Sequence, residues 1–139
     1  MSDSSGFIFD SNGIDRDKLS WIKDLKNNRR GRISEYADHF DGVVFTKTEP
    51  EPSLNGVWGG DVDVALPCAT QNELNGEEAK MLVENNVIAV AEGANMPCTP
   101  EAIAVFQEGG VLFAPGKASN AGGVATSGLE MSQNSLRLS

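Results

Sequence analysis

The second half of the chain alternates short apolar runs with amphipathic stretches, and this alternation restricts the possible folds more than any other feature. Apolar runs of strand length occupy residues 62–66, 87–91 and 111–114. Helix-length segments with apolar residues three and four positions apart separate these runs. Such a series predicts an α/β fold with a parallel sheet that helices cover on both faces.

Local capping signals predict where the helices of this series begin. Asn75 followed by Glu78 has the spacing of a capping box. Thr99 followed by Pro100 places a side-chain cap before a proline at the first helical position. A last helix is expected from about residue 121 into the 130s.

Ligands of parallel sheets bind at the carboxyl ends of the strands. In this chain those ends correspond to residues 68–70, 92–95 and 115–116. The last of them opens the block at 115–134, which contains four glycines and two asparagines. Glycine has no Cβ, so a backbone of this composition can approach a ligand closely. We therefore expect a binding site at this edge of the sheet.

The first half carries weaker signals. Residues 7–13 end in Asn-Gly and predict a small β-hairpin, while Asp15 is a candidate cap for the following helix. The basic run at 26–32 is interpreted as a solvated helix end. Residues 46–60, which include Glu-Pro-Glu-Pro, are expected to form a surface loop.

Composition excludes several classes of function. The net charge of −9 argues against a nucleic-acid partner, and no apolar run approaches the roughly 20 residues of a membrane helix. Two cysteines, Cys68 and Cys98, and the single His39 are too few for a zinc site, and a reduced, intracellular chain is expected. Dinucleotide Gly-x-Gly-x-x-Gly, Walker A and nucleophile-elbow motifs are absent from the sequence.

Three stretches resemble the hexameric, NADP-type glutamate dehydrogenases. They are Ala-Leu-Pro-Cys-Ala-Thr-Gln-Asn-Glu at 65–73, Ala-Glu-Gly-Ala-Asn-Met-Pro at 91–97 and the glycine-rich block at 115–134. The resemblance covers essentially all 139 residues. It implies part of the nucleotide-binding domain, a partial Rossmann-like doubly wound sheet that lacks the first strand, the glycine-rich turn and the first helix.

For the whole enzyme the resemblance implies reversible oxidative deamination of L-glutamate to 2-oxoglutarate and ammonia. A lysine would activate water and an aspartate would move protons, and both would precede Met1. Residues 1–139 are therefore expected to be one partial dinucleotide-binding domain of a longer, homohexameric, cytoplasmic or organellar enzyme, without catalytic residues of their own and inactive alone. No metal, nucleic-acid or membrane partner is expected.

The resemblance also assigns site residues. Ser127 would hydrogen-bond the side-chain carboxylate of glutamate, and Val124 would pack on the substrate. Asn95 and Asn120 would face the nicotinamide side of the coenzyme, because an amide both donates and accepts. Ala69 and Thr70 match a strand end that lines the cofactor site.

Residues 1–6 resemble the end of the second strand of a dinucleotide fold, next to the adenosine ribose. Ser2, Asp3 and Ser4 are thus candidate coenzyme contacts. Hydroxyl groups and nearby cations at this place tolerate a 2′-phosphate. The resemblance favours NADP, with NAD less expected.

Two alternatives stay open. One is a related dehydrogenase for branched-chain or aromatic amino acids, which would place an apolar side chain where Ser127 stands. The other is a non-catalytic dinucleotide-fold module, which the missing phosphate-binding turn allows.

Overall fold

The computed structural model describes residues 1–48 and 56–136, and it divides the chain into two compact units. The first unit is Met1–Val57 and the second is Trp58–Ser139. A short 3₁₀ helix, η1, spans Gly56–Gly59. The Glu-Pro-Glu-Pro part of the expected loop lies outside the described residues.

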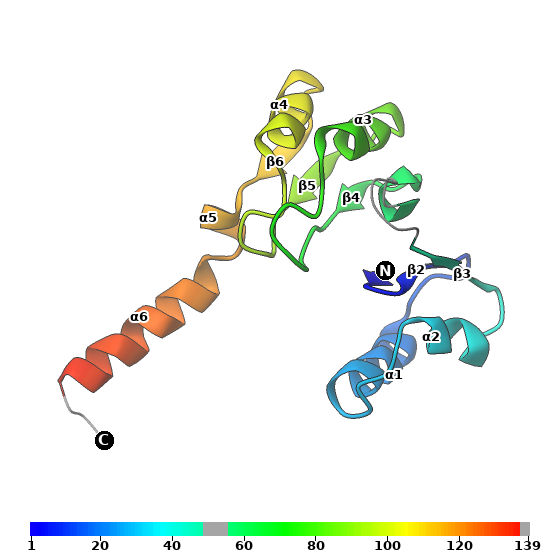
Figure 1. Cartoon of the computed structure of the whole chain (residues 1–139), viewed down its shortest axis with the longest axis horizontal. Helices are drawn as coiled ribbons and strands as arrows, with labels where there is room; N and C mark the ends of the chain where they lie inside the picture. Colours follow the sequence, from blue (N-terminus) through cyan, green and yellow to red (C-terminus); the bar gives the residue numbers. More distant parts are fainter. Residues whose placement is uncertain (49–55, 137–139) are drawn as a thin grey trace. The chain divides into compact units, whose positions relative to one another are not determined.

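The first unit contains a three-stranded antiparallel sheet in the order β1-β2-β3 (Figure 1). Its strands are β1 (Ser2–Asp3), β2 (Gly6–Asp10) and β3 (Val43–Lys47). Ser4 and Ser5 form the turn between β1 and β2. The first residues thus belong to a hairpin, where the sequence indicated the end of a parallel strand.

Helices α1 (Arg16–Asn27) and α2 (Ser34–His39) lie on one side of this sheet. Asp15 caps α1 as expected, because its side chain accepts a hydrogen bond from the Lys18 amide at 2.9 Å. The buried side chains of this core come from both helices, the sheet and the segment between the helices: Ile8, Ile22, Ile33 and Tyr36.

The expected hairpin at residues 7–13 is wrong. A turn does form there, with the Gly13 amide donating to the Asp10 carbonyl at 3.0 Å, but the chain then enters α1. The partner of β2 on its second side is β3, with Phe7 opposite Thr46. The Asp10 carboxylate accepts hydrogen bonds from Lys18 Nζ at 2.7 Å and Tyr36 Oη at 2.6 Å. Lys18 lies in α1 and Tyr36 in α2, so these two hydrogen bonds favour entry into the helix after the turn over return along a hairpin.

The second unit is built on a parallel sheet, as the alternation predicted. Its strands are β4 (Val64–Ala65), β5 (Ala89–Ala91) and β6 (Leu112–Ala114), in the order β4-β5-β6. Val90 pairs with Phe113, at the centre of the sheet. The α/β class is therefore confirmed for this part of the chain.

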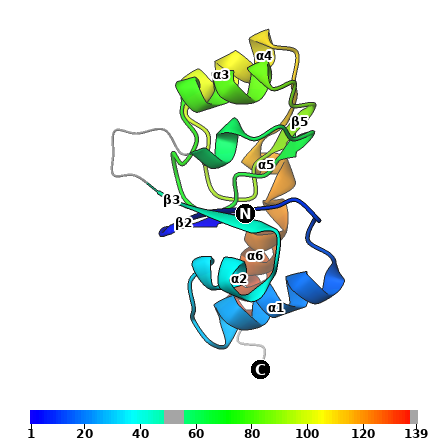
Figure 2. The same ribbon diagram turned by 90° about the vertical axis from the view of Figure 1, so that its right-hand side faces the viewer.

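Helices α3 (Gly76–Glu84) and α4 (Pro100–Glu108) lie side by side over the sheet in both ribbon views (Figures 1 and 2). Both begin at the predicted caps. The Asn75 side chain accepts from the Glu78 amide while Glu78 reaches back to the Asn75 amide, and Thr99 accepts from the first turn of α4. These caps satisfy backbone donors that a helix start leaves unpaired.

Only one face of this sheet is covered within residues 58–136. Ala65 and Val90 point toward the helices and are buried. Val64, Leu66 and Leu112 are between half and three-quarters exposed. Within this unit α3 and α4 belong to the same layer, so no helix of residues 58–136 covers the second face of the sheet.

The chain continues from β6 through α5 (Gly116–Ser119) into α6 (Ala121–Ser135), the predicted last helix. None of the residues of α6 is buried. In Figure 1 this helix extends away from the parallel sheet of its own unit. Within its unit α6 contacts the short α5, and its first turns lie near the loops at the strand ends.

Candidate functional site

An open pocket of about 440 Å³ lies in the second unit, where the loops after β5 and β6 meet the start of α6. It combines backbone of two glycines with amide, hydroxyl and apolar side chains. Its lining residues are Gly93, Asn95, Asn120, Gly123, Val124, Ser127 and Met131. The structure thus brings together four of the residues that the sequence indicated: Asn95, Asn120, Val124 and Ser127.

The two asparagines occupy loops that are hydrogen-bonded to each other. Asn120 Nδ2 donates to the Ala94 carbonyl at 2.7 Å, directly before Asn95 in the chain. The Gly93 amide donates to the Pro67 carbonyl at 3.0 Å, which joins this loop to the end of β4. Among the described residues, the carboxamide of Asn95 and Oδ1 of Asn120 have no hydrogen-bond partner. Both groups are therefore available to a ligand.

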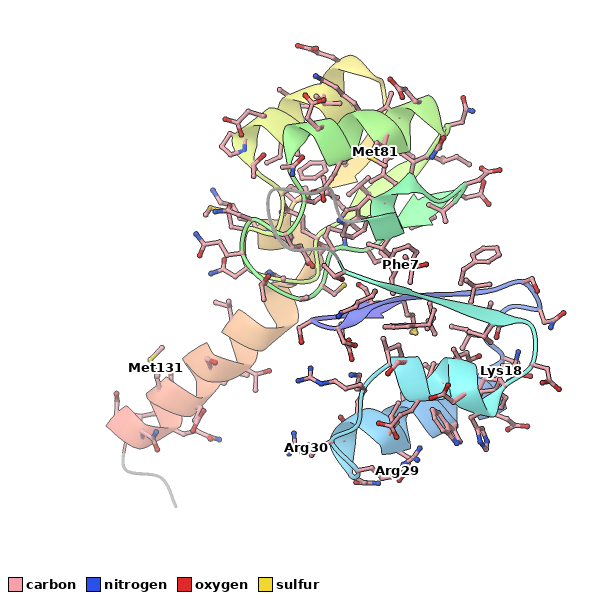
Figure 3. The ribbon with its side chains drawn as sticks, turned by 45° about the vertical axis from the view of Figure 1, so that its right-hand side comes forward. Phe7, Lys18, Arg29, Arg30, Met81 and Met131 are labelled. Carbon is pink, nitrogen blue, oxygen red and sulfur yellow. The ribbon has the colours of Figure 1, made fainter. Side chains whose placement is uncertain are left out.

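Helix α6 contributes one face to the pocket. Val124, Ser127 and Met131 follow each other at spacings of three and four residues, which places them on one side of a helix. Figure 3 shows Met131 on the outer part of α6. The hydroxyl of Thr126 donates to the Gly122 carbonyl of its own helix at 3.0 Å. Within the described residues the Ser127 hydroxyl has no such bond and is free to bind a ligand.

Ala69 and Thr70 lie after β4, exposed, and do not line the pocket. The Ala69 amide donates to Glu73 Oε1 at 2.8 Å, which fixes the turn that follows the strand. The Asn72 amide donates to the Met96 carbonyl at 3.0 Å. The loops after β4 and β5 are thereby tied together, so that the strand ends of this unit form one continuous edge.

Ser2, Asp3 and Ser4 lie in the first unit. The Asp3 carboxylate is surrounded by donors: the amide and hydroxyl of Ser5 at 2.9 and 2.6 Å, the Ile33 amide at 2.9 Å, and Lys26 Nζ. Burial opposes ionisation of this group, but the donors outweigh burial and hold the pKa of Asp3 well below its ordinary value.

The basic run at 26–32 is not simply a solvated helix end. Lys26 pairs with Asp3, and Arg32 Nη1 donates to Ser4 Oγ at 2.8 Å. Lys26 and Arg32 therefore contact residues 3 and 4, which the family resemblance had placed near the coenzyme ribose. Arg29 does follow the expectation in part: it is exposed and pairs with Asp24.

Sequence reasoning missed three participants in these arrangements. Met131 was identifiable, because it continues the spacing of Val124 and Ser127 by one further turn. Arg32 was identifiable only by its charge. Glu92 belongs to the strand end at 92–95, but its burial to 5% exposure gave no signal in the sequence, since it depends on contacts with residues far along the chain.

Residues 1–48 and 56–136 contain no group of three or more histidine, cysteine, aspartate or glutamate side chains that could hold a metal ion. No helix in the same residues has both the length and the apolar character to cross a membrane. Cys68 is exposed and Cys98 is buried, and both are free thiols.

A pocket at the carboxyl ends of parallel strands, with a helix on one side, is the place where open α/β sheets bind their ligands, and it defines this part of the chain as an α/β protein of that type. The model of one family, the Glutamate/Leucine/Phenylalanine/Valine dehydrogenases, matches residues 1–139. The chain belongs to this dehydrogenase family.

Individual relatives agree with this membership. A glutamate dehydrogenase of Bacteroides thetaiotaomicron is 57% identical over 138 residues, 99% of this chain and 30% of the relative. An NADP-specific glutamate dehydrogenase of Escherichia coli is 54% identical over 99% of this chain and 29% of its own length. An NAD-specific glutamate dehydrogenase of Bacteroides fragilis is 50% identical over 100% of this chain and 30% of its own length. The chain thus spans less than a third of these curated relatives.

Among solved structures, the glutamate dehydrogenase of Plasmodium falciparum superposes with a TM-score of 0.82 at 44% identity. The match covers 96% of this chain and 27% of the Plasmodium chain. A hetero-hexameric glutamate dehydrogenase of Thermus thermophilus has a TM-score of 0.64 at 23% identity, over 94% of this chain and 26% of its own, and shares the fold.

Proposed function

We propose that this chain forms the nicotinamide side of the coenzyme cleft and part of the substrate site in an NADP(H)-dependent glutamate dehydrogenase. The reaction is the reversible conversion of L-glutamate to 2-oxoglutarate and ammonia. The observation that carries the proposal is the pocket that gathers Asn95, Asn120, Val124 and Ser127 at one edge of a parallel sheet. The glutamate dehydrogenases among the relatives support the choice of substrate.

The pocket residues suit a nicotinamide coenzyme. Such a coenzyme, when bound, accepts or donates the hydride at C4 of its ring. A carboxamide ligand needs one donor and one acceptor, and the free carboxamide of Asn95 together with Oδ1 of Asn120 offers both. Gly123 has open space where a Cβ would stand, so a flat ring can approach the backbone there. These residues bind and orient the ring.

Ser127 is our candidate for recognition of the substrate side chain. Its hydroxyl is free among the described residues and can donate a hydrogen bond to a carboxylate. Val124 offers an apolar contact one helical turn earlier. A branched-chain or aromatic substrate would leave the serine hydroxyl without a partner, which disfavours the alternative family members.

The first unit supports NADP over NAD. An acidic residue next to the ribose selects NAD when it can accept from the 2′-hydroxyl, but the Asp3 carboxylate is already occupied by Lys26, Ser5 and the Ile33 amide. Ser4 Oγ and the Arg32 guanidinium lie together instead, and both are groups that bind phosphate oxygens. We expect Arg32→Ala to weaken NADPH binding more than NADH binding.

The proposal is tested in a chimera in which residues 1–139 replace the matching segment of the E. coli relative. We expect 2-oxoglutarate- and ammonia-dependent oxidation of NADPH, and none from the 139-residue chain alone. Ser127→Ala should lower kcat/KM for 2-oxoglutarate by about tenfold, since an exposed hydrogen bond to a charged group contributes at least about 1.5 kcal/mol.

Ser132→Ala is the matched control, because the Ser132 hydroxyl donates to the Gly128 carbonyl of its own helix at 3.0 Å. It should change kcat/KM by less than about twofold. A chimera that prefers leucine or phenylalanine would favour the related dehydrogenases, and one that binds no nucleotide would favour a non-catalytic module. The proposal includes a homohexamer for the whole protein, which light scattering of that protein would test.

A further inference from the structure

Glu92 is one of two buried charged residues among the described positions, the other being Glu78. Glu78 caps the start of α3. Glu92 stands directly after β5, below the pocket, and does not line it. A buried carboxylate costs free energy unless donors surround it, so its partners indicate what it does.

The two carboxylate oxygens of Glu92 bind different loops. Oε1 accepts the Cys98 amide at 3.2 Å, at the far end of the loop that carries Asn95. Oε2 accepts the Gly116 amide at 2.6 Å, in the segment that leads to Asn120. One side chain therefore joins the two segments that bear the pocket asparagines.

The Glu92 carboxylate also acts on the thiol of Cys98. Burial, together with the Glu92 carboxylate, raises the pKa of this thiol to about 12. The S–H group accordingly keeps its proton in ordinary buffers. The backbone of Glu92 repeats the connection, because its amide donates to the Ala114 carbonyl at 3.0 Å and its carbonyl accepts from Ser119 Oγ.

Gly116 lies where these contacts converge. A Cβ at this position would stand 3.3 Å from Glu92 Oε2, 3.3 Å from the Ala94 carbonyl oxygen and 3.1 Å from Asn120 Nδ2. Gly116 therefore contacts the Glu92 carboxylate on one side and the Asn120 side-chain amide on the other. A shift of Glu92 would move both asparagine loops.

We propose that Glu92 is a positioning residue: its buried carboxylate holds the loop of Asn95 and the loop of Asn120 at a fixed separation and thereby sets the geometry of the pocket. The effect on turnover rests on the proposed function, whereas the connection between the loops does not. A glutamine would not replace it, because its NH₂ group would face one of the two backbone amides and leave that donor unpaired.

The loop connection is tested by amide hydrogen exchange of the 139-residue chain. Glu92→Gln should speed exchange of the Gly116 or the Cys98 amide by at least about tenfold, while the Leu82 amide in α3 keeps its rate. Glu77→Gln, an exposed residue paired with Lys80, is the matched control and should change neither. Unchanged exchange at both loop amides in Glu92→Gln would overturn the proposal.

The functional consequence is tested in the chimera. Glu92→Gln should raise the KM for NADPH about tenfold, equivalent to about 1.4 kcal/mol, and leave the KM for ammonium within twofold. A residue that served stability alone would reduce the amount of active enzyme without moving a KM. Ser119→Ala, which removes the hydrogen bond to the Glu92 carbonyl, should raise the NADPH KM in the same direction.

The outcomes separate the two claims. An active wild-type chimera whose NADPH KM is unaffected by Glu92→Gln refutes the positioning role and leaves the proposed function intact. A wild-type chimera without nucleotide binding or turnover refutes the proposed function. The exchange rates of Gly116 and Cys98 then still decide whether Glu92 holds the two loops.

Discussion

Replacement of Val90 by alanine tests which face of the parallel sheet is the core of the second unit. Val90 is fully buried in the central strand β5, between Ala65 and Phe113 of the neighbouring strands. The change removes two methyl groups, and buried methylene-sized groups contribute about 0.8 kcal/mol each. The cavity that remains raises the expected loss to about 2–3 kcal/mol.

This loss is large for a unit of this size, whose total stability is expected to be about 4–12 kcal/mol. With a urea dependence of about 1 kcal/mol per M, the unfolding midpoint should fall by about 2–3 M. The chain has two tryptophans, and Trp58 belongs to the second unit. Its fluorescence, measured in a Trp21→Phe background, reports the unfolding of that unit.

Val64→Ala is the matched control: the same chemical change in the adjacent strand, on the exposed face of the same sheet. Val64 is 52% exposed, so its truncation should cost less than about 0.5 kcal/mol. Equal destabilisation by both substitutions would refute the assignment of the core to the face under α3 and α4. An unchanged midpoint in Val90→Ala would refute it as well.

Further predictions concern charge, thiols and backbone packing. The folded-state pKa of Asp3 lies below its ordinary value of 3.8. The ionised Asp3 therefore stabilises the fold above about pH 4, and this contribution is lost as the pH falls below that value. In Asp3→Asn, the free energy of unfolding should therefore fall less steeply with decreasing pH than in the wild type. Iodoacetamide at pH 8 should label only the exposed Cys68 in the folded chain. After unfolding, mass spectrometry should detect a second adduct on Cys98, which is buried in the folded chain. Labelling of both cysteines in the folded chain would contradict the burial of Cys98. Gly6→Ala places a Cβ 2.2 Å from the Thr46 carbonyl oxygen, so urea unfolding of the first unit should show a loss of more than about 2 kcal/mol.

The parts of the fold that depend on local interactions could be predicted from the sequence. The starts of α3 and α4 follow from Asn75 and from Thr99 with Pro100, since a cap acts within one helical turn. The parallel sheet follows from the alternation of strand and helix lengths. The rule that ligands bind at the carboxyl ends of strands indicated the edge of the sheet at which the pocket lies, and the family resemblance assigned Asn95 and Asn120 to it.

Contacts between distant residues could not be predicted in this way. Strand β3 pairs with β2 across more than thirty residues, and the Asn-Gly turn near β2 gives no information about that partner. Glu92 has the composition of a solvated loop residue, and only the amides of Cys98 and Gly116 make its burial possible. That both helices of residues 58–136 lie on the same face of the parallel sheet likewise depends on contacts between distant residues.

The lack of buried residues in α6 has a consequence for affinity. A helix of about fifteen residues is only marginally stable in water by itself, and Gly122, Gly123 and Gly128 each lower its propensity by about 1 kcal/mol. Val124 and Ser127 are correctly placed only in molecules whose α6 is formed. The observed dissociation constant of a pocket ligand is therefore the intrinsic one divided by the helical fraction. A surface that packs on α6 would tighten ligand binding in the same proportion without contacting the ligand.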